Sequence, residues 1–215
     1  MNLYKFIQHK EKMCSYFNIW LYKNALYKCG NGVSFDGDIT IHNPKGVIIE
    51  DKCIIKKGAI INSRVDEKEY GIWLGENVKI HEYAYLDDYG GRIQIGSNTG
   101  IGQFCVIGGQ GGLKIGRDCM IAGHTYIVSA NHKFDNISIP FREQGEEKKG
   151  IIIGNNVWIG AGCIILDGVT IGDNSVIGAG TVVTKSVISG TLNVGVPSKA
   201  IRKIGNSTSL NLLAN

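Results

Sequence analysis

The chain has 215 residues and a formal net charge of +4, with 30 glycines but only 3 prolines. This length can bury a sizeable core in one or two domains, and so much glycine beside so little proline indicates tight bends in a regular scaffold rather than a disordered linker. The mild charge, without a dense basic stripe, excludes an electrostatic nucleic-acid binder, and no apolar run approaches the roughly 20 residues of a membrane span.

Residues 1–28 carry the positive surplus and predict a helix. They hold five lysines against one acidic residue. Large apolar residues recur at helical spacing: Met13, Tyr16, Phe17 and Trp20. One interpretation is a helical cap over residues 1–30 that closes the open end of the core. The other is a basic, aromatic helix that makes peripheral contact with a membrane. Because the start shows no signal-peptide pattern, we expect a cytoplasmic protein, at the inner face of the membrane in the second case.

Beyond this segment, apolar residues recur every six positions, which matches neither the 3.6 of a helix nor the 2 of a half-buried strand. The unit starts are all Ile, Leu or Val and form six groups of three: Ile49, Ile55, Ile61; Leu74, Ile80, Leu86; Ile95, Ile101, Ile107; Ile115, Ile121, Ile127; Ile153, Ile159, Ile165; Ile171, Ile177, Val183. A fainter phase at Val33 and Ile39 suggests a partial earlier turn. Three short strands joined by bends make one triangular coil, and stacked coils enclose an apolar column. The sequence therefore predicts an all-β solenoid of about six coils over residues 31–195.

Four of the six cysteines stand at the fifth place of a unit, where the bend needs a small buried side chain: Cys53, Cys105, Cys119 and Cys163. No two cysteines have the CxxC spacing of a zinc or redox motif. We therefore interpret the cysteines as structural residues rather than as nucleophiles or metal ligands.

Insertions interrupt the repeat only after the third unit of a group. The step between unit starts lengthens from six to 13 (61 to 74), 9 (86 to 95), 8 (107 to 115) and 26 (127 to 153). All four insertions must therefore leave the solenoid at the same corner in consecutive coils. Because loops on a rigid scaffold tend to carry function, we expect the site along this edge. The longest insertion, residues 129–150, reads SANHKFDNISIPFREQGEEKKG.

The segments NHKFD in that insertion, IGNNVWIGAG after it and GVPSKAIRKI near the end occur in this order. With the six-residue units, the chain resembles the hexapeptide-repeat O-acetyltransferases, in the branch of galactoside, maltose and xenobiotic acetyltransferases and of surface-polysaccharide biosynthesis. The resemblance covers roughly residues 33–204. It implies a left-handed parallel β-helix, an exception to the usual right-handed crossover. It also implies a C-terminal helix in the closing segment 196–215, a homotrimer with sites between subunits, acetyl-CoA as donor and no required metal.

The resemblance also assigns roles to individual residues. His132 takes the position of the general base; the alternative is a surface histidine without a catalytic role. A sugar hydroxyl does not ionise at neutral pH, so a base must accept its proton during attack, and an imidazole suits that role. Trp158 would lie beside His132 and the thioester, or else form a subunit contact. Acetyl-CoA would be held by backbone groups and side chains of Ala161, Ala179, Thr184, Lys185, Lys199 and Arg202.

The acceptor, a sugar or glycan, should lie against the other loops of the same edge. Candidates for the site wall are Asn131, Asp87, Asp88, Tyr89 and Gln103, with Gln110 as an alternative to Gln103. These residues do not name the sugar or the hydroxyl.

Three other functions remain open at this point. An N-acetyltransferase acting on an amino sugar nucleotide would share all of these features. A γ-type carbonic anhydrase has the same fold but needs three histidines around zinc, whereas His124 and His132 are eight residues apart and His81 lacks a matching partner. A non-catalytic trimeric scaffold would need neither the loop histidine nor the cations near the end of the chain.

Overall fold

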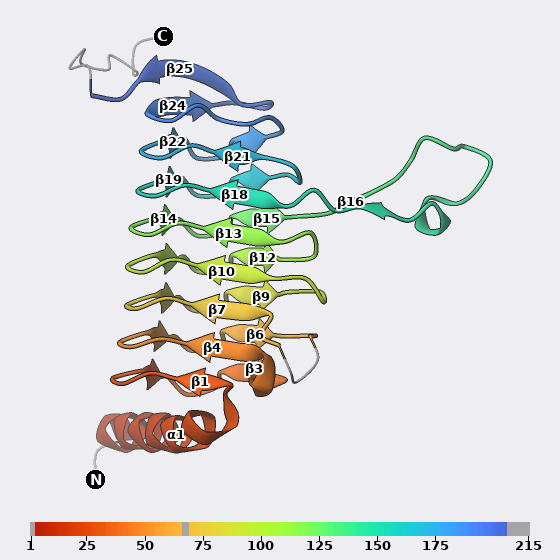
Figure 1. Cartoon of the computed structure of the whole chain (residues 1–215). Coiled ribbons are helices and arrows are strands. Elements are labelled where there is room, and N and C mark those ends of the chain that lie inside the picture. The colour runs from red at the N-terminus through yellow and green to blue at the C-terminus, as the bar shows by residue number, and fades with distance from the viewer. Residues whose placement is uncertain (1–2, 66–68, 206–215) are drawn as a thin grey trace.

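The computed structural model describes residues 3–65 and 69–205, which form a triangular column of parallel coils with an N-terminal helix across its lower end (Figure 1). Sheet A consists of β1 (Lys28–Cys29), β4 (Val47–Ile49), β7 (Ile72–Leu74), β10 (Ile93–Ile95), β13 (Leu113–Ile115), β18 (Ile151–Ile153) and β21 (Thr170–Ile171). Sheet B consists of β2 (Ser34–Phe35), β5 (Ile54–Ile55), β8 (Lys79–Ile80), β11 (Gly100–Ile101), β14 (Met120–Ile121), β19 (Trp158–Ile159), β22 (Val176–Ile177), β24 (Thr191–Val194) and β25 (Lys199–Lys203). Sheet C consists of β3 (Thr40–His42), β6 (Ile60–Asn62), β9 (Tyr85–Asp87), β12 (Val106–Gly108), β15 (Tyr126–Val128), β20 (Ile164–Ile165) and β23 (Val182–Val183).

The column has one more coil than the six complete groups of the repeat. The additional coil, β1–β2–β3, comes first, and its Val33 and Ile39 are buried at the places where the sequence shows only a faint phase. In Figure 1 the strands of sheet A face the viewer and point to the left while the chain climbs from the N-terminus, so the coil is left-handed. The solenoid and its handedness agree with the prediction.

The six-residue repeat builds the core by placing one aliphatic side chain of each unit on the column axis. Ile153, Ile159 and Ile165 pair in register with the residues one coil above, and each is at most 1% exposed. Fully burying such a side chain contributes roughly 1.5–3 kcal/mol. One coil cannot cover its own aliphatic residues, so stability arises from stacking.

The four fifth-place cysteines are buried in the bends, as predicted. The Cys53 thiol donates to the Gly75 carbonyl oxygen at 3.0 Å, and burial raises the pKa of Cys53 to about 11. Burial likewise raises the pKa of Cys105, Cys119 and Cys163. Since the thiolate is the nucleophile, these residues are unsuited to attack.

Thiol titration of the native protein should therefore detect only Cys14 and Cys29, which are partly exposed. The four bend cysteines should react after unfolding, because only then do they reach the reagent and ionise. Ellman's reagent with and without denaturant measures both populations. Fast reaction of more than two thiols in the native state would contradict the buried assignment.

Helix α1 (Leu3–Ala25) lies across the N-terminal end of the column, where the cap interpretation expects it (Figure 1). Its contact face differs from the expected one. Ser15 donates its hydroxyl to the Phe35 carbonyl, Asn18 donates its amide to the Asp36 carbonyl at 2.8 Å, and the Tyr22 ring lies 5.4 Å from the Phe35 ring. The large apolar stripe that suggested the cap points to solvent instead: Met13, Tyr16, Phe17 and Trp20 are all exposed. No helix within the described ranges has the length and apolarity needed to cross a bilayer.

The closing segment corrects the expected C-terminal helix. After Gly195, whose φ is 102°, β25 runs antiparallel to β24, with Lys199 opposite Val194 and Thr191 opposite Lys203. This pairing satisfies the hydrogen-bonding edge that the last strand of sheet B would otherwise leave open. Within residues 196–205 the segment is thus a strand and not a helix, and residues 206–215 lie outside the described residues.

Candidate functional site

All four predicted insertions leave the column where sheet C passes into sheet A, an edge that we call the C–A corner. They connect β6 to β7, β9 to β10, β12 to β13 and β15 to β18. Consecutive coils stack in register, so the insertions lie one above the other along one edge, as the sequence predicted.

The longest insertion, residues 129–150, forms an arm that projects far from the column (Figure 1). Its root is a two-stranded antiparallel ribbon of β16 (Asn131–His132) and β17 (Glu146–Glu147), and η2 (Phe141–Glu143) lies beyond it. His132 is exposed and stands directly opposite Glu146. Cβ atoms of such an opposed pair are about 4.5–5.5 Å apart, so the two side chains leave the same face of the ribbon.

Two contacts hold the Glu146 carboxylate in place. Gln110 donates its amide to Glu146 Oε2 at 2.6 Å, and the Lys148 ammonium lies 3.2 Å from the same oxygen. The hydrogen bond from Lys148, and then that from Gln110, lowers the pKa of Glu146. A charged carboxylate is therefore held on the ribbon at the position opposite His132.

Asp87 and Asp88 do not have the role expected of them. Both side chains are completely buried. Asp88 accepts the Ser63 hydroxyl at 2.7 Å and the backbone N–H groups of Arg64 and Gly90, both at 2.8 Å. These bonds engage both oxygens of the buried carboxylate and fix two neighbouring loops, so the role of Asp88 here is structural.

Asp87 is occupied in the same way by donors from four residues. The Arg64 guanidinium binds it through Nε at 3.0 Å and Nη2 at 2.7 Å, and the Tyr85 hydroxyl and Asn62 amide each donate at 2.7 Å. The Tyr89 N–H donates to Oδ1 at 2.8 Å. Burial by itself would raise the pKa of Asp87, but these hydrogen bonds, that of Arg64 first, hold it below its ordinary value. The sequence predicted Asp87 as a wall residue that contacts the acceptor; in the structure it is a buried anchor.

What Asp87 supports is an aromatic surface beside the arm. The guanidinium carbon of Arg64 lies 4.9 Å from the centre of the Tyr89 ring. Asp87 therefore holds Tyr89 in two ways: it accepts the Tyr89 N–H, and it binds the Arg64 guanidinium that lies over the ring. Tyr89 borders a hollow of about 220 Å³ on the outer side of sheet C. The hollow is lined by Tyr89, Val106, Gly108, Gln110, Tyr126, Val128 and Ser129. It combines aromatic walls with a few polar groups, as small-ligand sites do.

A second candidate surface lies at the B–C corner, where sheet B passes into sheet C. Ala161 and Ala179 stack there in consecutive coils, and the Gly180 N–H donates to the Ala161 carbonyl at 2.8 Å. Within the part of the chain that the structure describes, the N–H groups of Ala161 and Ala179 have no acceptor. Trp158, on the neighbouring strand β19, is 51% exposed and lies in register with exposed Met120.

Below these alanines the corner carries a stack of three rings. Tyr83 and Phe104 have ring centres 5.2 Å apart, and Phe104 and His124 are 5.1 Å apart, all nearly parallel. Gly162 and Gly180 occupy the same place in the next two coils. A Cβ atom added at either glycine would meet no other atom within 4 Å. The missing side chains leave an open shelf above the His124 ring, alongside the two free N–H groups.

Gln103 belongs to this second surface rather than to the first. Its carbonyl accepts the His124 N–H at 2.8 Å, so it lies at the B–C corner, away from the loops that carry Tyr89. Gln110, the alternative, does line the hollow near His132. The grouping of Gln103 with Asp87 and Tyr89 is therefore wrong for a single chain. Gln103 precedes sheet C at the B–C corner, whereas Asp87 and Tyr89 lie at the other end of sheet C, at the C–A corner.

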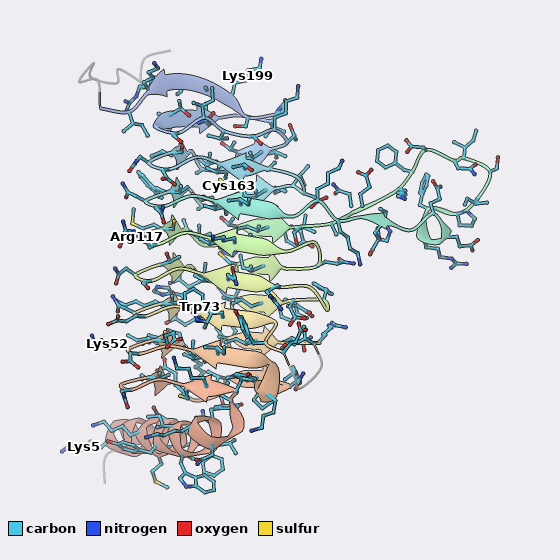
Figure 2. The ribbon with its side chains drawn as sticks, in the orientation of Figure 1. Lys5, Lys52, Trp73, Arg117, Cys163 and Lys199 are labelled. Atoms are coloured by element: carbon cyan, nitrogen blue, oxygen red, sulfur yellow. The ribbon has the colours of Figure 1, made fainter. Side chains whose placement is uncertain are left out.

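The remaining predicted residues are also divided between the edges. Thr184 and Lys185 follow β23 at the C–A corner, whereas Lys199 and Arg202 are exposed on β25 at the far end of sheet B (Figure 2). In a triangular column the C–A corner is opposite sheet B, so His132 and Trp158 of one chain cannot meet (Figure 1). Across residues 3–65 and 69–205, no group of three His, Cys, Asp or Glu side chains is arranged to hold a metal ion.

Comparison with known proteins assigns the chain to a family. The bacterial transferase hexapeptide (six repeats) profile matches residues 150–185. The putative lipopolysaccharide biosynthesis O-acetyl transferase WbbJ of Escherichia coli is 30% identical over 171 residues, which covers 76% of this chain and 82% of WbbJ. The chain belongs to the hexapeptide-repeat acetyltransferases.

The chain is also similar to a second curated protein and, in fold, to a solved structure. The probable acetyltransferase Rv3034c of Mycobacterium tuberculosis is 28% identical over 158 residues, which covers 73% of this chain and only 51% of that protein. The chain thus spans about half the length of that relative. In fold, it is similar to AntD, an N-acyltransferase from Bacillus cereus solved with dTDP-4-amino-4,6-dideoxyglucose and coenzyme A (TM-score 0.63, 24% identity, 88% of this chain and 90% of AntD).

The geometry also adds residues to this acetyltransferase that sequence reasoning missed. Glu146 opposes His132, Arg64 clamps Asp87, and Tyr126 lines the hollow. A signal for Arg64 exists in the repeat: Asn62 and Asp87 occupy equivalent places in consecutive coils, which puts the residues after Asn62 beneath the loop after Asp87. No such signal exists for Glu146, because its position depends on how the arm folds back.

Proposed function

We propose that the protein is an acetyl-CoA-dependent O-acetyltransferase that transfers acetyl to a hydroxyl of a sugar, in the biosynthesis of a surface polysaccharide or glycan. The observation that carries this proposal is the pairing of His132 with an anchored carboxylate at the rim of an aromatic hollow. The name of WbbJ, a lipopolysaccharide biosynthesis O-acetyl transferase, supports the acceptor class.

In the proposed reaction His132 acts as the general base. It accepts the proton of the acceptor hydroxyl while that oxygen attacks the thioester carbonyl carbon of acetyl-CoA. The new C–O bond forms, the C–S bond breaks, and the proton passes from His132 to the departing thiolate of coenzyme A. Glu146 orients the imidazole and favours its transient positive charge. No covalent enzyme intermediate is required, in keeping with the buried cysteines.

The acceptor is assigned to the hollow beside the arm. Tyr89 and Tyr126 offer flat faces for a sugar ring, and Gln110 and Ser129 offer polar groups. Asn131 lies next to His132 on the same strand. Asp87 and Asp88 act indirectly by fixing the Tyr89 loop, instead of touching the sugar.

The donor is assigned to the B–C corner. The free N–H groups of Ala161 and Ala179 suit the amide-rich pantetheine arm, and the open shelf above His124 leaves room for it. An N–H at this corner, that of Ala161 first, would also stabilise the negative charge on the thioester oxygen. Lys199 and Arg202 on exposed β25 suit the nucleotide phosphates.

Because His132 and the B–C corner are on opposite sides of a chain, we propose that neighbouring subunits complete each site in a cyclic homotrimer. The arm supports this: Phe134, Ile137 and Phe141 are exposed on it, Ile137 by 94%. Exposed apolar groups on a projecting segment indicate a surface that another chain covers. Thr184 and Lys185, at the C–A corner, would reach the donor from the subunit that supplies His132.

A subunit-mixing experiment tests the shared site. His132→Ala removes the base and Trp158→Ala disrupts the donor corner, so each variant alone should have little transfer activity. Co-assembled in equal amounts, they should regain roughly a quarter of wild-type activity, since half the arms and half the donor corners are intact and must coincide. Activity no higher than the mean of the separate variants would refute the composite site.

A transfer screen tests the reaction itself. Wild-type protein with acetyl-CoA and a panel of neutral sugars, amino sugars and sugar nucleotides should form base-labile O-acetyl esters. Stable N-acetyl products, formed only with amino sugars, would refute O-transfer and support the N-acetyltransferase alternative. Mass spectrometry before and after mild alkali distinguishes the two products.

A further inference from the structure

We propose that the outer face of α1 docks this protein onto the surface of an anionic phospholipid bilayer. The face consists of Met13, Tyr16, Phe17, Trp20 and Leu21, and we call it the aromatic face. All five side chains are exposed, Tyr16 by 70% and Trp20 by 66%. This inference does not depend on the proposed reaction.

The fold already uses the opposite side of the helix. Ser15, Asn18, Ile19 and Tyr22 contact or pack against the first coil, and Leu26 is buried behind them. At about 100° per residue, these positions centre on one side of the helix and the aromatic face on the other. The cap therefore needs none of the five exposed apolar side chains, and capping does not explain their presence.

The distribution of charge identifies the partner. Lys12 and Lys23 lie along one flank of the aromatic face and Lys10 along the other, all exposed. Lys5, also exposed, stands on α1 at the end of the column opposite Lys199 (Figure 2). An apolar stripe bordered by lysines matches a bilayer surface, where rings enter the headgroup boundary and ammonium groups meet lipid phosphates.

The two aspartates that share a hollow with Lys10 and Lys12 have other partners. Lys10 and Lys12 border a hollow that also contains Asp36 and Asp38, but those carboxylates pair with Lys56 and Lys57 at 3.5 and 3.6 Å. Two copies joined through this face would bring lysines from both helices together, and such like-charge contact is unfavourable. Charge complementarity therefore favours an anionic bilayer over a second copy of the chain.

The position of the helix permits contact with a flat surface. α1 lies across the end of the column, and the coils are all on one side of it (Figure 1). The described chain thus presents the full length of the aromatic face without a neighbouring loop in the way. Docking would stand the column upright on the bilayer.

Vesicle co-sedimentation of the full chain tests the proposal. Wild-type protein should bind phosphatidylcholine vesicles that contain phosphatidylglycerol, and should bind pure phosphatidylcholine at least tenfold more weakly. Phe17→Ser with Trp20→Ser should weaken binding to the anionic vesicles by more than tenfold, because two rings no longer leave water. Lys12→Gln with Lys23→Gln should weaken it by about tenfold or more and leave the rings intact.

The control is Ile188→Ser, which removes an exposed apolar side chain away from α1 and should leave vesicle binding unchanged. Thermal melting should be the same for all variants, since none of the changed side chains packs in the core. Equal vesicle binding by wild type and the Phe17/Trp20 variant, or no preference for phosphatidylglycerol, would overturn the proposal. So would concentration-dependent self-association without lipid that the Phe17/Trp20 variant loses, because the face would then serve a second copy.

Discussion

Replacing His132 with alanine should lower the turnover number for acetyl transfer by about 10²–10⁴, the usual contribution of a positioned general base. This factor corresponds to about 3–5 kcal/mol of transition-state stabilisation. The Michaelis constant for acetyl-CoA should change little, because the free N–H groups assigned to the donor are at the B–C corner and not on the arm. Steady-state kinetics at saturating acceptor measure both quantities.

Lys133→Ala is the matched control, because Lys133 is the next residue on the arm and is also exposed. It should retain nearly full activity. Both variants should melt at the wild-type temperature, since the arm contributes nothing to the buried column. Undiminished transfer by His132→Ala would refute the mechanism. A large rise in the Michaelis constant for acetyl-CoA, with turnover unchanged, would instead make His132 a binding residue.

The architecture could be predicted because one rule recurs in every coil. An aliphatic residue at each sixth place fixes which side chain of a strand points into the core. A longer step between two such residues fixes where a loop leaves the column. Both were read from single residues and their spacing, without knowledge of long-range contacts. The C–A corner was located in the same way, from the four places at which the step exceeds six.

The sequence-based predictions failed where contacts between residues far apart in the sequence determine the structure. Asp87 looks like a solvated loop acid until Arg64, 23 positions earlier, covers it. Helix α1 has an apolar stripe that periodicity detects, but the side that contacts the column is the one with Ser15 and Asn18, chosen by hydrogen bonds to the first coil. The closing strand β25 formed because sheet B offered an open edge.

The relative placement of the candidate site residues could not be read from the repeat alone, because it depends on where each one leaves the column. The sequence identified His132 and Trp158 correctly as residues outside the core, yet stacking puts them on opposite sides of the column. Only a second copy could bring them together. The repeat in one sequence gives no direct record of such an arrangement, which entered as an expectation from the resemblance and remains part of our proposal.

Replacing Asp87 with alanine should destabilise the protein by about 3 kcal/mol, the largest effect on stability that we expect from a polar residue. The change leaves the Tyr85 hydroxyl, the Asn62 amide and the Tyr89 N–H without their acceptor. Each buried group left unsatisfied costs about 1–3 kcal/mol, and removing one member of a buried ion pair costs about 3–5 kcal/mol. We expect the lower end because the Arg64 side chain is 51% exposed and can return to water.

Urea unfolding at one fixed protein concentration measures this loss, with Asp38→Asn as the control. Asp38 lies 3.6 Å from Lys57 and is 77% exposed, so its removal should cost less than about 1 kcal/mol. The Asp87 effect should also depend on pH. Since the folded protein lowers the pKa of Asp87, its stabilisation is complete above the ordinary value of 3.8 and disappears as the pH falls through the lowered folded value. The difference in unfolding free energy between wild type and Asp87→Asn should therefore narrow in acid below that ordinary value. A difference that stays constant into strong acid would mean that the Asp87 charge does not hold the Arg64 and Tyr89 loops together.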